Sequence, residues 1–240
     1  MATAAIVTIG NELLSGDVAN TNGSWLAARL EAVGLEVRLL AVLPDEIEAV
    51  AVFLRAHGPE VDVIIVTGGL GGTPDDVTRE ALAATFGVPQ VAFPEVAEDL
   101  RARFRGDPDY VTPWANLPEG SRPLENPLGG APGFAIGNAY VLPGLPSEME
   151  AMYEVIETEL SGAAPIASWR RVYATRESAI VEVLRELERR HPVVRVGSYP
   201  SFRPEGSRVE IVLKSSDPEE LAAASAWAEA ELAQFARPAA

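Results

Sequence analysis

The sequence predicts an α/β domain with a mostly parallel sheet at residues 1–163, followed by a small α+β domain at residues 164–240. In the first part, apolar runs alternate with amphipathic stretches, which is typical of right-handed βαβ units. Residues 161–168 read SGAAPIAS, a run of small residues expected of a linker. After this run the order changes to strand, helix, strand, strand and helix, which favours helices packed on one face of a small sheet.

Each element of the first domain follows from its residue pattern. Strands are expected where short runs of branched apolar residues occur, and helices where the apolar period lengthens to three or four residues. Asn20 or Asn22 is the expected N-cap of the first helix, Gly34 is its expected end, and Gly87 ends the third helix. The expected strands are 4–10, 35–43 and 61–69, with a hairpin at 133–144. The expected helices are 20–34, 45–58, 73–87, 94–106 and 146–160.

Two regions complete the expected organisation. Residues 107–132 are rich in Pro and Gly, and loops of that length in a compact domain are usually functional. The small domain alternates between strand and helix patterns. Its expected strands are 169–175, 193–200 and 208–215, and its expected helices are 177–190 and 217–236.

Composition argues against several classes of function. The net charge is −16, which disfavours nucleic acid or an anionic membrane as a partner. Cysteine is absent, which excludes disulfides, thiolate zinc sites and cysteine nucleophiles. His57 ends a helix and His191 precedes a proline, and both positions suit structural or exposed roles better than catalysis. No run approaches the ~20 apolar residues of a membrane span and no signal peptide is evident, so we expect a cytoplasmic protein.

The stretch TGGLGGTPDD, at 67–76, is the main candidate for chemistry. Its glycines leave room for backbone N–H groups to converge on an anion without obstruction by side chains. No lysine follows them, as it would in a Walker loop, and the spacing of a Rossmann fingerprint is missing. We therefore expect Gly68, Gly69 and Gly71, with Thr73 after them, to hold a phosphate group of a ligand.

Asp75 and Asp76 stand directly after these glycines. One interpretation is structural: Thr73 caps the following helix, Pro74 takes its first position and Asp76 completes a capping box. The other is chemical, because two carboxylates beside a phosphate repel it unless a divalent cation joins the two sets of oxygens. The upstream glycines favour the second interpretation, since a cap does not need them. Asp75 and Asp76 are then the expected ligands of Mg²⁺, Mn²⁺ or Co²⁺.

Polar groups also follow the first two strands. IGNELLSGDVANTN carries Glu12, Ser15 and Asn22 after the first strand, and Asp45 follows the second. In open α/β folds, ligands bind at the carboxyl edge of the sheet, where these residues are expected. Taken alone, the first segment is better explained as a solvated loop with an Asn cap, and Asp45 as an N-cap. Carboxylates after three successive strands are harder to explain by capping.

A further segment, LPGLPSEME, begins the helix expected at 146–160. Gly144, Ser147 and Glu148 are expected to contact an anion at the start of this helix. An ordinary loop-to-helix cap is the alternative.

Taken in order, IGNELLSGDVANTN, PDE, TGGLGGTPDDVTREA, NPLGGAPGF and LPGLPSEM resemble the molybdopterin-binding (MoCF-biosynthesis) domain, and most closely its CinA, or competence/damage-inducible, branch. The resemblance covers about residues 4–159, and VGSYPSF in the tail is similar to the small domain of short CinA-like proteins. It implies a three-layer α/β/α fold with the phosphate of the ligand on the glycine loop. The carboxy-terminal amidase domain of full-length CinA is not recognised, so the resemblance does not imply that activity.

The resemblance also implies roles for the acids. Two aspartates that serve magnesium-linked chemistry in molybdopterin adenylyltransferases match Asp45 and Asp76. In the CinA branch the implied activity is metal-dependent hydrolysis of ADP-ribose or a similar nucleotide diphosphate, with Asp75, Asp76 and Glu12 as candidate metal ligands. The sequence departs from the family at two places. Gly72 stands where the family usually carries Pro, and TPWAN replaces a longer polar and basic segment.

Three functions follow, in order of preference. The first is a metal-dependent pyrophosphatase in which Asp45, Asp75 and Asp76 hold the cation and Glu12 orients the attacking water. The second is molybdenum-cofactor biosynthesis, either adenylyl transfer to molybdopterin or metal insertion. The third is a nucleotide-binding or pterin-binding protein without catalysis, favoured by the short TPWAN segment. In each, the partner is a small dinucleotide or pterin, and a dimer or trimer of the chain is expected.

Overall fold

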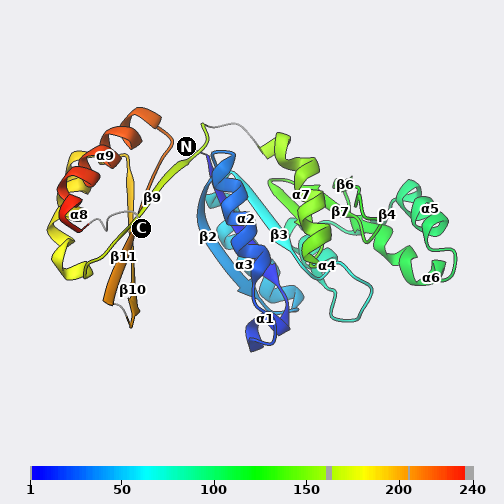
Figure 1. Cartoon of the computed structure of the whole chain (residues 1–240). Helices are drawn as coiled ribbons and strands as arrows, with labels where there is room; N and C mark the ends of the chain where they lie inside the picture. The colour runs from blue at the N-terminus through cyan, green and yellow to red at the C-terminus, as the bar shows by residue number, and fades with distance from the viewer. Residues whose placement is uncertain (1, 161–163, 205, 236–240) are drawn as a thin grey trace. The chain divides into compact units, whose positions relative to one another are not determined.

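The structure is a computed structural model that describes residues 2–160, 164–204 and 206–235. It divides into two compact units, Met1–Ala163 and Ala164–Ala240 (Figure 1). Of the segment predicted as a linker, residues 161–163 lie outside the described residues, as does position 236, where the last predicted helix ends.

A six-stranded sheet forms the centre of the first unit, in the order β2-β1-β3-β8-β7-β6. The first four strands are parallel, whereas β7 and β6 run antiparallel to their neighbours, so the sheet is mostly parallel as predicted. The strands are β1 Thr3–Ile9, β2 Glu36–Leu43, β3 Val63–Thr67, β6 Arg122–Leu124, β7 Gly133–Ile136 and β8 Ala139–Leu142. A separate antiparallel pair consists of β4 Gln90–Ala92 and β5 Asn116–Pro118.

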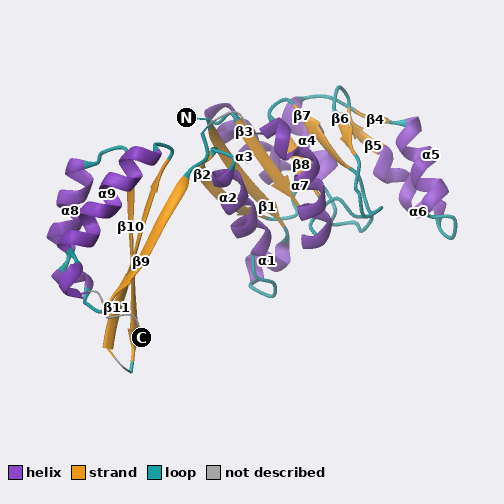
Figure 2. Ribbon diagram, turned by 45° about the horizontal axis from the view of Figure 1, so that its top comes forward, coloured by secondary structure: helices purple, strands orange, loops and turns teal. Residues whose placement is uncertain are grey.

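Helices cover both faces of this sheet (Figure 2). On β1, Ala4 and Ile6 share a core with α2 and α7, whereas Ala5 and Val7 share a core with α3 and α4. Alternate residues of one strand thus face two helical layers, which confirms the predicted three-layer fold. The helices are α1 Asn11–Ser15, α2 Thr21–Ala32, α3 Ile47–His57, α4 Thr78–Phe86, α5 Pro94–Arg103, α6 Pro108–Val111 and α7 Pro146–Leu160.

The register of the sheet brings four strand ends to one edge. Ile9 of β1 pairs with Leu43 of β2, and Thr67 of β3 pairs with Leu142 of β8. The segments that follow these strands therefore begin side by side.

Two predicted helix starts and one predicted loop are wrong. α3 begins at Ile47 instead of Asp45, because the Asp45 carboxylate accepts a hydrogen bond from the Asn11 N–H at 2.7 Å and so bonds across to the segment after β1. α4 begins at Thr78 instead of just after Thr73, since Asp76 bonds within the preceding loop. The Pro/Gly-rich region 107–132 contains α6, the 3₁₀ helix η2 (Thr112–Ala115), β5 and β6, so it is not one long loop.

The second unit has the predicted βαββα order. Its antiparallel sheet runs β10-β11-β9, and a core that includes Tyr173, Leu187, Ile211 and Ala224 joins it to α8 and α9. The elements are β9 Ala167–Tyr173, α8 Val181–Arg190, β10 Arg195–Arg203, β11 Gly206–Ser215 and α9 Pro218–Glu231. Within the described part of the chain, no helix has both the length and the apolar character needed to cross a membrane.

Candidate functional site

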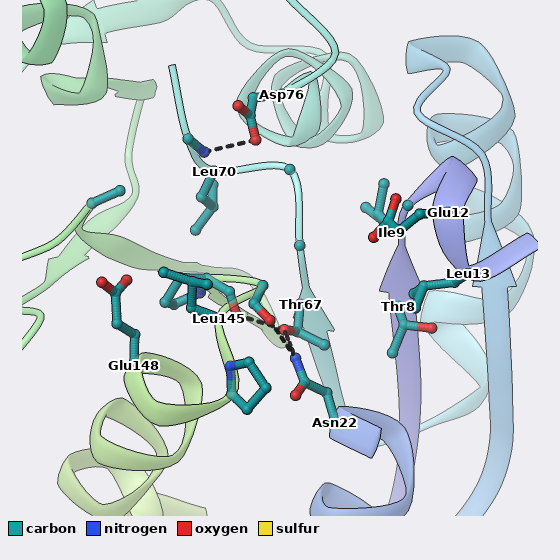
Figure 3. A pocket seen from close by; sticks show the side chains of 18 of the residues that line it. Thr8, Ile9, Glu12, Leu13, Asn22, Thr67, Leu70, Asp76, Leu145 and Glu148 are labelled. Atoms are coloured by element: carbon teal, nitrogen blue, oxygen red, sulfur yellow. Dashed lines mark hydrogen bonds between the residues drawn. The ribbon is translucent and has the colours of Figure 1, made fainter. Parts of the chain in front are cut away.

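A cavity of about 590 Å³ lies at the carboxyl edge of the parallel strands (Figure 3). The segments after β1, β2, β3 and β8 all line it, together with Phe104, Trp114 and the loop at 130–131. Ser15, Thr73 and Ser147 are not among its lining residues. The predicted site residues that it does bring together are Glu12, Asn22, Asp45, Gly68, Gly69, Gly71, Asp75, Asp76, Gly144 and Glu148.

The glycine loop after β3 passes too close to its neighbours for any side chain. Gly68 and Gly69 have φ of 106° and 65°, which L side chains rarely adopt. A Cβ on Gly68 would lie 2.2 Å from the Ile9 carbonyl oxygen, and one on Gly69 would lie 2.3 Å from Oγ1 of Thr78. The loop is therefore packed directly between the end of β1 and the start of α4.

Asp76 holds the middle of this loop in place. Its carboxylate accepts hydrogen bonds from the Gly71 N–H at 2.8 Å, the Thr73 N–H at 2.8 Å and the Thr73 hydroxyl at 2.6 Å. Thr73 and Asp76 thus make one of the two bonds of a capping box, from the Thr73 N–H to the Asp76 carboxylate, and they make it before the helix, which Thr78 begins. The Gly71 N–H, predicted to face a phosphate, is directed at Asp76 in this structure (Figure 3).

Arg79 stabilises the same loop by hydrogen bonds to two of its carbonyl groups. Its side chain donates to the Gly71 carbonyl at 3.2 Å and also to the Leu70 carbonyl. The residue is only 5% exposed, and burial lowers the pKa of its guanidinium. Sequence reasoning missed Arg79, although a basic residue in the first turn of a helix, against the dipole, is a usable signal.

The acid after β2 shares the cavity with the acids of neighbouring segments. Burial raises the pKa of the Asp45 carboxyl, and the hydrogen bond from the Asn11 N–H opposes that rise. The negative charges of Glu12, Asp75 and Asp76 raise it further. These carboxylates lie close enough to repel one another, which is the condition that a bound cation relieves.

Glu148, at the start of α7, faces the cavity from another side (Figure 3). Its carboxylate accepts a hydrogen bond from Nδ2 of Asn126 at 2.9 Å. Asn126 is 1% exposed, and the same nitrogen donates to the Ala131 carbonyl at 3.1 Å. A buried amide thus positions this carboxylate.

Asn22 joins α2 to the segment after β8 by hydrogen bonds. Its Nδ2 donates to the Gly144 carbonyl at 2.8 Å and to the Thr67 hydroxyl at 3.3 Å, while Asn20 serves as the N-cap of α2. Oδ1 of Asn22 is buried and has no partner among the described residues. Asn22 therefore fixes the edge of the cavity and keeps one acceptor unused.

The lining carries a strong excess of negative charge. Among its described residues there is no Lys, Arg or His. Over the described ranges, no three Asp, Glu or His side chains already stand together as a metal site. Carboxylate oxygens nevertheless suit a hard cation such as Mg²⁺, which binds proteins through one or two carboxylates and takes other ligands from phosphate and water. The lining carboxylates are Glu12, Asp45, Asp75, Asp76 and Glu148.

The fold and the cavity together define an open α/β domain with its candidate ligand site at the strand ends. The chain belongs to the molybdopterin-binding domain family: residues 5–161 match the family described as "Probable molybdopterin binding domain". Residues 169–237 match "FAD synthase, middle domain".

Similar proteins confirm the resemblance to the CinA branch. A protein of Pyrobaculum calidifontis is 40% identical over 213 residues, which is 83% of this chain and 81% of its own. A CinA-like protein of Frankia casuarinae is 37% identical over 89% of this chain, which spans only 54% of that relative. The structure of CinA from Thermoplasma acidophilum has a TM-score of 0.62 and 31% identity, covering 66% of this chain and 97% of its own.

Proposed function

We propose that this protein hydrolyses the phosphoanhydride bond of ADP-ribose or a similar nucleotide diphosphate with the help of a divalent cation. One observation carries the proposal. Five carboxylates line the cavity beside the glycine loop, and none of the described lining residues is basic. A diphosphate placed there alone would meet a repulsion of about 4 kcal/mol per charge pair, as Coulomb's law gives for spacings of roughly 4 Å and an effective dielectric constant of about 20.

The residues of this chain take distinct roles in the proposal. Asp45 and Asp75 would hold the cation, together with Asp76, whose carboxylate also keeps the glycine loop in shape. When bound, the cation supplies charge neutralisation on the diphosphate oxygens. Glu12 lies beside Gly10 at the end of β1, where its carboxylate would orient a water molecule and accept its proton.

A substrate screen tests this function. Purified protein is incubated with ADP-ribose, FAD and other dinucleotide diphosphates in the presence of Mg²⁺, Mn²⁺ or Co²⁺, and products are separated by chromatography. We expect AMP from at least one substrate, and loss of that product on addition of a chelator or in Asp45→Asn. Absence of AMP with every substrate and metal would overturn the proposal.

Molybdenum-cofactor biosynthesis is the second candidate, and the match of residues 5–161 to the family described as a molybdopterin binding domain favours it. Its reaction would transfer AMP from ATP to molybdopterin or insert the metal. Incubation with ATP and molybdopterin distinguishes this candidate from the hydrolase, because only molybdenum-cofactor biosynthesis yields an adenylylated pterin. Binding of a nucleotide or pterin without any turnover would instead indicate a non-catalytic binding protein.

A further inference from the structure

Two of the carboxylates in the cavity lie directly against a glycine. A Cβ on Gly10 would lie 2.4 and 2.7 Å from the two carboxylate oxygens of Glu12. A Cβ on Gly130 would lie 2.3 and 2.6 Å from those of Glu148. All four residues line the cavity. Real Cβ atoms essentially never come this close to other atoms, so each carboxylate occupies space that any other residue would fill. We call these two glycine–glutamate pairs the carboxylate seats.

The backbone conformation does not require glycine at either position. Gly10 has a φ of 164°, which is extended backbone that any residue adopts. Gly130 also lies outside the left-handed range, in contrast to Gly68 and Gly69 of the glycine loop. A side chain at Gly10 or Gly130 would therefore conflict with the neighbouring carboxylate and not with the backbone geometry.

Hydrogen bonds hold the backbone of Gly10 in place. Its N–H donates to the Leu43 carbonyl at the end of β2, at 3.1 Å, and its own carbonyl accepts from the Leu13 N–H at 3.3 Å. The backbone therefore has little freedom to move away from an added methyl group. The end of a glutamate side chain is flexible by comparison, so the Glu12 carboxylate is the group that would move.

The backbone on both sides of Gly130 is bonded to Asn126. The Gly129 N–H donates to the Asn126 carbonyl at 2.9 Å, and Nδ2 of Asn126 donates to the Ala131 carbonyl at 3.1 Å. The same Nδ2 donates to the Glu148 carboxylate at 2.9 Å, and Asn126 is 1% exposed. One buried side chain thus fixes both the loop and the acid, and a methyl group at Gly130 would separate them.

The two carboxylate seats lie on either side of the glycine loop. The sheet order places β3 between β1 and β8, and the loop follows β3. Glu12 follows β1 and Glu148 follows β8, so the two acids approach the cavity from opposite sides (Figure 3). Because Coulomb attraction falls with distance, a carboxylate displaced from the cavity would attract a cation there less strongly.

Resting on the proposed function, we propose that Gly10 and Gly130 are positioning residues of the site, because each leaves the space in which a cavity carboxylate lies. Gly10 positions Glu12, the acid that orients the attacking water in the proposed reaction. Gly130 keeps the negative charge of Glu148 inside the cavity that takes the cation.

The test compares Gly10→Ala and Gly130→Ala with Gly106→Ala, where a Cβ would meet nothing within 4 Å. Calorimetry with Mn²⁺ alone measures cation binding without any turnover. Both cavity variants should bind Mn²⁺ roughly 10-fold to 100-fold more weakly, the usual effect of losing a residue that orients a metal site. Their unfolding midpoints in urea should stay near that of the wild type, because only the end of a flexible side chain moves. Gly106→Ala should match the wild type in both measurements.

Double variants give a readout that a merely structural role would not produce. Once Glu148→Ala has removed the carboxylate, Gly130→Ala should weaken Mn²⁺ binding no further, and the same should hold for Gly10→Ala in Glu12→Ala. A further loss in the double variants would overturn the inference. So would wild-type Mn²⁺ affinity in the single variants, or a loss of affinity accompanied by a comparable loss of stability.

Crystal structures of Gly10→Ala and Gly130→Ala provide a second readout, which needs no bound metal. We expect the Glu12 or Glu148 carboxylate to have left its position beside the new methyl group while the backbone stays in place. A carboxylate that keeps its position next to a shifted backbone would overturn the positioning role.

Failure of the positioning role is distinguishable from failure of the proposed function. If Mn²⁺ affinity falls in both alanine variants but ADP-ribose is never cleaved, the hydrolase fails while the positioning role stands. If the wild type and both alanine variants cleave ADP-ribose equally fast, the positioning role fails while the hydrolase stands.

Discussion

The carboxylate of Asp76 accepts a hydrogen bond from the backbone N–H of Gly71 at 2.8 Å, inside the glycine loop. The same carboxylate accepts two more bonds from Thr73. The acid that the sequence marks as a candidate for catalysis therefore also shapes the loop that is expected to hold phosphate. Its neighbour Asp75 lines the same cavity. Mutations can therefore separate the roles of the two adjacent aspartates in stability and in activity.

Asp76→Ala should lower both stability and activity. It removes the acceptor of three hydrogen bonds, and with net values of roughly 1 kcal/mol each the cost is about 1–3 kcal/mol. Asp75→Asn should lose activity, because a candidate metal ligand is neutralised, while its unfolding midpoint stays near that of the wild type. Urea titration and an assay of AMP release measure the two effects. Equal stability of both variants would contradict the loop role of Asp76.

How far the sequence predicts the fold depends on the range of the interactions involved. The stops at Gly34 and Gly87 are local features that the sequence predicts, and it narrows the cap of α2 to Asn20 or Asn22, of which the structure uses Asn20. It does not predict the start of α4, because that start depends on Asp76 bonding back to Gly71, five residues earlier, in preference to capping a helix.

Prediction of the candidate site is limited in the same way, by contacts between residues that lie far apart in the sequence. Carboxylates after successive strands are visible in the sequence, because parallel strands bring their ends to one edge. The pairing of Asn126 with Glu148 spans 22 positions, and that of Asn22 with Gly144 spans 122. No local pattern encodes such contacts, so the residues that orient the acids emerge only from the structure.

Glu148→Gln should weaken cation-dependent activity without unfolding the protein. Asn126 can still donate to the amide oxygen of Gln, so the side chain keeps its position while the charge is lost. Asn126→Ala should instead cost about 1–3 kcal/mol of stability, because the Ala131 carbonyl loses its donor in a buried place. Glu150→Gln, on the same helix but outside the cavity lining, is the control. An effect of Glu150→Gln as large as that of Glu148→Gln would argue for general surface charge.

Acid should destabilise the first unit partly through Asp62. The Thr3 N–H and hydroxyl donate to its Oδ2 at 2.8 and 2.9 Å, and these bonds lower the pKa of Asp62 below 3.8. Because the pKa is lower in the folded state, the stabilisation is fully present at pH values above the pKa of the unfolded state. It is lost as the pH falls through the pKa of the folded state. In Asp62→Asn, the free energy of unfolding should therefore fall less steeply as the pH decreases; we call this fall at low pH the acid limb. Urea midpoints from about pH 5 to about pH 2 measure it.

Thr3→Val provides the matched variant for that titration. It removes the hydroxyl donor and keeps the N–H donor, so its acid limb should lie between those of the wild type and Asp62→Asn. An acid limb of Asp62→Asn that superimposes on the wild type would show that other carboxylates dominate.

Gly72 and Tyr110 should be energetically coupled. Gly72→Ala places a methyl group 2.8 Å from the Tyr110 ring, and overpacking of this kind typically costs about 1–3 kcal/mol. Tyr110 is 47% exposed, so its removal opens the space at modest cost. In the Tyr110→Ala background, the penalty of Gly72→Ala should therefore shrink. Gly106→Ala, where a Cβ would meet nothing within 4 Å, is the control and should behave alike in both backgrounds. A double-mutant cycle on urea midpoints gives the coupling energy, and strictly additive penalties would mean that the loop avoids the ring by moving its backbone.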